Sequence, residues 1–144
     1  MLIGEYTHTI DDKNRLSLPA KFRSALGKKV VVTPGLDGCL FLFTAKQWER
    51  ISGRLGESSM LQADARGFSR YLLGRAAEVP VDSIGRVLIP QPLFDYAELT
   101  ERVAVVGVES RVEIWDAKRW GECKQSVERQ ADALAEKLGG VGIL

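Results

Sequence analysis

Two arginines, each four residues after an aspartate and four residues before a proline, are the side chains of this sequence best suited to binding chemistry. The two sets are Asp11, Arg15, Pro19 and Asp82, Arg86, Pro90. A planar guanidinium can form two hydrogen bonds at once with a phosphate group or a guanine edge. The preceding carboxylate can instead pair with the arginine and fix a turn. The spacing therefore leaves two interpretations open, a nucleic-acid contact and a purely structural ion pair.

The same two stretches open an internal repeat, which predicts the elements that must position the arginines. Residues 11–48 match residues 82–120 in order, with one residue inserted midway. In each copy a tight turn ends on Asn14 or Gly85, a short apolar strand follows, and the proline suits the first turn of a helix. Two further apolar stretches predict buried strands. Each copy is therefore a β-β-α-β-β unit with an apolar face that cannot stand alone.

Two such units would pair about a pseudo-two-fold axis and close a small barrel, so we expect a mainly β protein with flanking helices, of the α+β class. The expected divisions are a first repeat over residues 5–47, connecting helices over 48–75, a second repeat over 76–119 and a C-terminal helical tail over 120–144. Residues 44–47 predict the capping box of one connecting helix, and residues 59–62 a similar start for the next. Residues 125–138 fit an amphipathic tail helix.

The distribution of charge says more than its total. The chain has 144 residues and a net charge of only +1, which gives no general signal for a polyanion partner. Residues 5–47 carry seven basic and four acidic residues, a net charge of +3, whereas residues 76–119 carry five basic and eight acidic residues, a net charge of −3. Lys13, Lys21 and Arg23 could add phosphate contacts in the basic half. The first turn is therefore expected to bind a polyanion more strongly than the second.

No catalytic, metal-binding or membrane-spanning pattern stands out. Cys39 and Cys123 lie far apart without C-x-x-C spacing, which favours free thiols. The single histidine, His8, fits a half-buried strand position. No nucleophile elbow, phosphate-binding loop or metalloprotease motif occurs, so we expect no enzyme activity, no cofactor, no metal and no small-molecule substrate. Without a secretory signal or an apolar run of ~20 residues, a cytoplasmic protein with no membrane partner is expected.

Two other function classes remain open on the residues alone. A barrel of this size can bind peptides along an open rim, which would make the protein an interaction or scaffold module. Asp11, Asp12 and Asp82 could also be imagined as paired carboxylates of an enzyme, although the nearby arginines favour ion pairs instead. Retention of duplex DNA would distinguish a nucleic-acid-binding protein from both.

The motifs taken together resemble the MraZ family of transcriptional regulators, within the AbrB/SpoVT-like superfamily. They cover residues 1–120 in order and are very specific. They are GEY at residues 4–6, D-x-x-x-R at 11–15 and 82–86, LSLPAKFR at 16–23, GLDGCL at 35–40, GRVLIP at 85–90 and VEIWD at 112–116. The resemblance implies a double-split, swapped-hairpin β-barrel built from two tandem AbrB-like repeats.

The resemblance also implies a function and a partner. Members of the family are sequence-specific DNA-binding regulators of the bacterial division and cell-wall gene cluster, including their own promoter. They bind direct repeats in double-stranded promoter DNA as homo-oligomeric rings, octamers or larger, which implies a cytoplasmic and nucleoid-associated protein. The family's DNA-facing turns correspond here to Asp11, Lys13, Arg15, Asp82 and Arg86. Asn14 stands where the family usually has glycine, and the second turn lacks a lysine.

Overall fold

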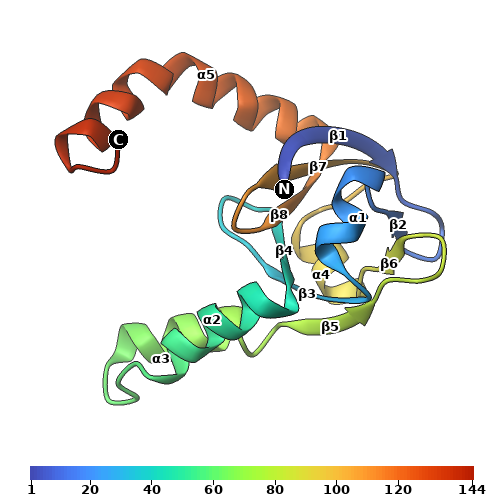
Figure 1. Cartoon of the computed structure of the whole chain (residues 1–144), viewed down its shortest axis with the longest axis horizontal. Coiled ribbons are helices and arrows are strands. Elements are labelled where there is room, and N and C mark those ends of the chain that lie inside the picture. The colour runs from blue at the N-terminus through green and yellow to red at the C-terminus, as the bar shows by residue number, and fades with distance from the viewer.

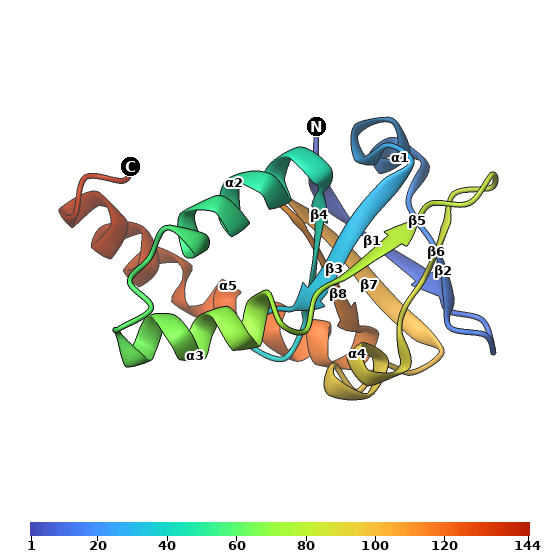
Figure 2. The same cartoon turned by 90° about the horizontal axis from the view of Figure 1, so that it is seen from below.

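The computed structural model describes all 144 residues, Met1–Leu144, and shows a β-barrel from which helices project (Figures 1 and 2). The elements, in chain order, are β1 Ile3–Thr9, β2 Arg15–Ser17, α1 Ala20–Leu26, β3 Lys29–Pro34, β4 Leu40–Thr44, α2 Ala45–Gly56, α3 Ala63–Leu72, β5 Ala77–Pro80, β6 Arg86–Leu88, α4 Gln91–Tyr96, β7 Arg102–Val108, β8 Val112–Asp116 and α5 Ala117–Gly140. The order repeats a β-β-α-β-β unit twice, which confirms the predicted repeat.

The strands form one antiparallel sheet and one two-stranded ribbon. The sheet has the order β1-β7-β8-β4-β3-β5, so the first strand of each repeat lies at an edge beside strands of the other repeat. The ribbon pairs β2 with β6, again joining the two repeats. Each β-hairpin thus exchanges partners with the other, which confirms the swapped-hairpin barrel.

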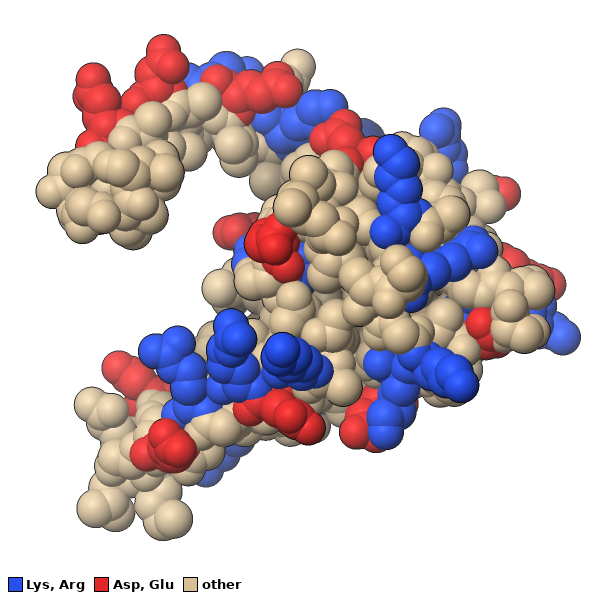
Figure 3. All heavy atoms as spheres, viewed as in Figure 1, with Lys and Arg blue, Asp and Glu red and all other residues tan.

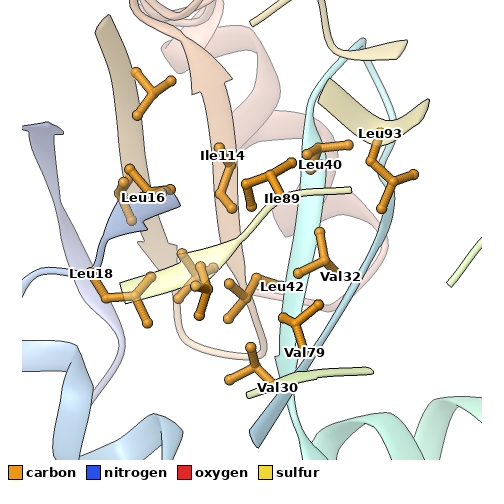
Figure 4. Close-up of a cluster of buried hydrophobic side chains, with 14 of the residues drawn as sticks. Leu16, Leu18, Val30, Val32, Leu40, Leu42, Val79, Ile89, Leu93 and Ile114 are labelled. Atoms are coloured by element: carbon orange, nitrogen blue, oxygen red, sulfur yellow. The ribbon is translucent and has the colours of Figure 1, made fainter. Parts of the chain in front are cut away.

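One hydrophobic core fills the space between sheet and ribbon. It contains 20 buried residues contributed by both repeats, among them Leu16, Phe22 and Val87, whose side chains are at most 1% exposed. Figure 4 shows the ribbon residue Leu16 facing the sheet residues Leu42 and Ile114. Because apolar area from both repeats lies in one core, neither repeat is a separate domain.

The helices begin where the sequence places their capping residues, with one exception. Pro19 and Pro90 precede α1 and α4, which cover opposite ends of the barrel (Figure 2). Thr44 forms the predicted capping box with Gln47 at the start of α2. The expected start at residues 59–62 is wrong, because the Ser59 hydroxyl accepts a hydrogen bond from the Leu61 N–H within a turn and α3 begins only at Ala63.

Two helical projections extend from the barrel. Helices α2 and α3 form a helical arm on one side, and the longer α5 leaves the barrel on another (Figure 1). The first turns of α5 cover a second buried cluster on the sheet, in which Trp120 and Cys123 pack against Trp115. No helix is both long and apolar enough to cross a membrane.

Candidate nucleic-acid interface

The first turn, residues 11–15, is organised around the carboxylate of Asp11. Its Oδ1 accepts hydrogen bonds from the backbone N–H groups of Lys13 and Arg15, both at 2.9 Å, and its Oδ2 lies 2.7 Å from Arg15 Nε. Asn14 adopts a left-handed backbone with φ of 58°, which asparagine tolerates better than most residues. The ion pair fixes the turn and holds the Arg15 side chain in a defined direction.

The second turn, residues 82–86, repeats this geometry. Asp82 Oδ1 accepts from the N–H groups of Ile84 and Arg86 at 3.1 and 2.8 Å, and Oδ2 lies 2.8 Å from Arg86 Nε. Gly85, with φ of 83°, takes the place of Asn14. In both turns the backbone N–H of the arginine, followed by the other donors, holds the pKa of the aspartate below its ordinary value. Each carboxylate is therefore ionised at neutral pH.

The structural interpretation of the Asp–Arg spacing is thus confirmed, and it leaves the arginines available for a ligand. Both contacts use only Nε of the guanidinium. The two Nη groups of Arg15 and of Arg86 make no hydrogen bond within the protein. A bidentate ligand such as a phosphate binds a guanidinium through these same groups.

The ribbon brings the two arginines onto one surface. Leu16 pairs with Val87 at its centre, and both side chains point into the core. Because side chains alternate along a strand, the neighbours on each side point outward. Arg15 lies opposite Leu88, and Arg86 lies opposite Ser17, so the arginines are diagonal neighbours on the outer face of the ribbon.

Two of the other predicted basic residues, Lys13 and Arg23, lie at opposite ends of this ribbon. Lys13 lies at the exposed tip of the first turn, and neither Lys13 nor Lys21 has an ion-pair partner. Arg23 reaches from α1 to the second turn. Its Nε donates to Leu18 O at 3.0 Å, and its guanidinium lies against Gly85, where an added Cβ would come within 2.3 Å of Nε. Arg23 of the first repeat is thus in contact with Gly85 of the second.

The first turn has a different neighbour. Asn14 Nδ2 donates to Gln91 Oε1 at 2.8 Å, and the Ile89 N–H donates to the backbone oxygen of Asn14 at 2.8 Å. A hollow of about 470 Å³ beside this turn is lined by Asp11, Asp12, Asn14, Phe94, Glu101 and two more residues. Gln91 was missed by sequence reasoning, because nothing in the sequence shows that α4 packs against the turn of the other repeat.

The structure contains no cluster suited to a metal ion, and its two cysteines and single histidine are at least partly buried. No group of three or more His, Cys, Asp or Glu side chains is arranged to hold a metal ion. Cys39 is fully buried, and Cys123, on α5, is partly buried against the cluster that contains Trp115. His8 is partly buried in β1, where burial and then the positive charge of Arg23 lower its pKa. Of the predicted site residues, Arg15 and Arg86 lie on the outer face of the ribbon, and Arg23 contacts its second turn.

A swapped-hairpin barrel with two tandem repeats, each presenting an aspartate-fixed arginine turn, is the fold that the resemblance to the AbrB/SpoVT-like superfamily implies. The family model described as "MraZ protein, putative antitoxin-like" matches residues 1–71 and again residues 72–138. The chain belongs to the MraZ family.

Close relatives support the same assignment over the full length. A protein of Moorella thermoacetica is 47% identical over 138 residues, which cover 96% of each chain. Proteins of Acetivibrio thermocellus and Caldanaerobacter subterraneus subsp. tengcongensis are 41% and 43% identical over 143 residues, which cover 99% of this chain and 100% of theirs. All three are named transcriptional regulator MraZ.

Proposed function

We propose that this protein is a sequence-specific DNA-binding transcriptional regulator and has no catalytic role. The observation that carries the proposal is the pair of arginines, Arg15 and Arg86, held by Asp11 and Asp82 on one outer face with their Nη groups free. A guanidinium fixed in direction loses less side-chain freedom when it binds a phosphate or a guanine edge. The names of the relatives agree with this role.

The proposed partner is double-stranded promoter DNA. From the family resemblance, the target is the division and cell-wall gene cluster and the protein's own promoter, bound at direct repeats by a cytoplasmic, nucleoid-associated protein. Asp11, Lys13, Arg15, Asp82, Arg86, Lys21 and Arg23 are the proposed DNA-binding residues. The aspartates position the arginines, whereas the basic residues contact the DNA.

We also propose that the protein self-associates into a ring, and α5 supports this part. Its apolar stripe begins at Trp120 and Cys123 against the barrel and continues beyond it. Val127, Leu134 and Leu138 are 49%, 39% and 38% exposed and have no covering element in the protomer. Figure 3 shows that the side of α5 facing the helical arm is largely uncharged.

Charge complementarity supports a contact between α2 of one copy and the outer side of α5 of another. Three exposed basic residues on α2 and three exposed acidic residues on α5 each recur every four positions, and none has an ion-pair partner within the protomer. They are Lys46, Arg50, Arg54 and Glu128, Asp132, Glu136. Figure 3 shows basic side chains along α2 and acidic ones on the outer side of α5. Several weak DNA contacts in one ring would act together through avidity.

DNA binding is tested by fluorescence anisotropy with duplexes from the chain's own upstream region and with scrambled duplexes. Arg15→Ala and Arg86→Ala should each weaken specific binding by about ten- to a hundred-fold, as expected for loss of a bidentate base contact. Arg129→Ala, which removes an exposed cation of α5, is the matched control. Equal affinity of the wild-type protein for both duplexes would overturn sequence-specific recognition, and no binding to either duplex would favour a protein-interaction module.

Ring formation is tested separately by light scattering. Arg50→Glu should reduce the oligomer mass, and the added substitution Asp132→Arg should restore it if the two stripes meet between copies. An unchanged mass in Arg50→Glu would exclude this interface.

A further inference from the structure

Because the hairpins are exchanged, Arg23 of the first repeat lies at the second turn. The second repeat has no basic residue at the equivalent position. Residues 82–86 contain one arginine, one aspartate and no lysine. Arg23, from the first repeat, packs its guanidinium against Gly85 and donates through Nε to Leu18 O at 3.0 Å. It is solvent-exposed and has no carboxylate partner. Two arginines therefore stand together at this end of the ribbon, one supplied by each repeat.

The contact depends on glycine at position 85. A Cβ there would lie 2.3 Å from Arg23 Nε and 2.5 Å from Cζ, so any side chain would displace the guanidinium. The turn also needs the left-handed backbone of Gly85, whose φ is 83°. The equivalent residue of the first turn, Asn14, occupies this space with a side chain that bonds to Gln91. A guanidinium is thus admitted at only one of the two turns.

The opposite end of the ribbon has a different charge. The residue equivalent to Arg23 in the second repeat is Phe94, which lines the hollow beside the first turn together with Asp12 and Glu101. The first turn therefore has Lys13 and Arg15 against Asp11, Asp12 and the nearby Glu101. The second has Arg86 and Arg23 against Asp82 alone. A phosphate approaching the second end meets less repulsion.

We propose that Arg23 is a phosphate-binding residue of the second turn and that this turn is the stronger of the two backbone contacts with DNA. The inference rests on the proposed function and reverses the weight that the sequence places on the first turn. In the swapped fold, Arg23 of the first repeat acts at the end of the ribbon that the second repeat provides.

The experiment measures binding to a non-specific duplex over a series of salt concentrations. Each phosphate contact contributes about 0.9 to the slope of log K against log salt concentration. Arg23→Gln should lower the slope by about 0.9, whereas Lys13→Gln should lower it by less than half as much. Arg129→Gln should leave it unchanged. Thermal unfolding of each variant identifies any loss of fold, and Arg23→Lys, which keeps the charge, should restore most of the slope.

The outcomes separate the inference from the proposed function. A larger effect of Lys13→Gln than of Arg23→Gln overturns the inference while leaving a DNA-binding regulator in place. Binding without preference for the upstream duplex removes the specific regulator, yet the ranking of the two variants still decides the role of Arg23. If the wild-type protein binds no duplex at low salt, both proposals are wrong.

Discussion

Leu16 lies directly opposite Val87 at the centre of the β2–β6 ribbon, and the two side chains are 0% and 1% exposed. The pseudo-two-fold relation between the repeats passes through this pair, since Arg15 and Arg86 flank it on opposite sides. The same two residues that place the arginines outward thus bury the inner face of the ribbon. Core stability and arginine position are consequently coupled.

Leu16→Ala should destabilise the protein by about 2–5 kcal/mol, the range for removing a buried leucine side chain. Leu88→Ala is the matched control, because Leu88 lies on the same ribbon but is 52% exposed. It should change the free energy of unfolding by no more than about 0.5 kcal/mol. Urea unfolding measures both values, and similar costs for the two variants would contradict the described orientation of the ribbon.

Acid should weaken the two turns. The pKa values of Asp11 and Asp82 are lowered in the folded protein, so their contribution to stability is present above the unfolded value and lost as pH falls through the folded value. The doubly substituted Asp11→Asn, Asp82→Asn protein should show a smaller fall in melting temperature below pH ~4 than the wild type. Because the ion pairs are partly exposed, we expect a small stability change at pH 7 but a loss of DNA affinity as the arginines become mobile.

His8 reports the position of Arg23. Burial, and secondly the charge of Arg23, lower the pKa of this histidine. Arg23→Gln should therefore raise the pKa of His8 without restoring its ordinary value of about 6.5, because burial remains. An NMR titration resolves this shift directly, since the chain has one histidine. An unchanged His8 pKa in Arg23→Gln would show that the Arg23 side chain points away from His8.

The lowered pKa of His8 also makes the folded protein less stable as the pH falls. The unfolded chain takes up the proton first, so the contribution of His8 is present above pH ~6.5 and is lost as pH falls towards the folded pKa.

The two cysteines should differ in reactivity. Cys39 is fully buried, burial raises the pKa of its thiol, and its Sγ donates to Leu36 O at 3.3 Å. Cys123 is partly exposed. An aromatic disulfide reagent should modify one thiol in the folded protein and a second only after denaturation. In Cys123→Ser no thiol should react before unfolding.

The capping box of α2 should contribute measurably to stability. Thr44→Ala removes the hydroxyl that accepts from the Gln47 N–H at 3.1 Å, which should cost about 0.5–2 kcal/mol. Gln62 occupies the equivalent position before α3 but makes no capping hydrogen bond with its side chain. Gln62→Ala should accordingly change the unfolding midpoint little. Both variants are compared in urea at equal protein concentration, because oligomerisation affects apparent stability.

The internal repeat made much of the fold predictable. Matching turns, Pro19 and Pro90, and the apolar stretches all located elements that the structure contains. Local patterns, however, describe which face of a strand is apolar and not which strand is its neighbour. The pairing of β2 with β6 came from the family resemblance, since a sequence of two hairpins is equally compatible with each hairpin closing on itself.

The sequence predicted the local part of the candidate site but not its contacts between the two repeats. The spacing from Asp11 to Arg15 indicated the ion pair, which depends on one local turn. The contact of Arg23 with Gly85 joins residues of different repeats, so no local pattern could reveal it. Gly85 gave the only available signal, a residue without a Cβ beside a predicted strand.

The partner exchange between β-hairpins has a consequence for how the chain reaches its folded state. Strands β1, β2, β5 and β6 each pair with a strand of the other β-β-α-β-β unit, so the fold resembles a dimer joined in one polypeptide, with α2 and α3 as the linker. The linker turns an encounter between two molecules into an intramolecular search at high effective concentration. A chain cut between α2 and α3 should thus yield fragments that remain unfolded alone and assemble on mixing, with a rate that depends on their concentration.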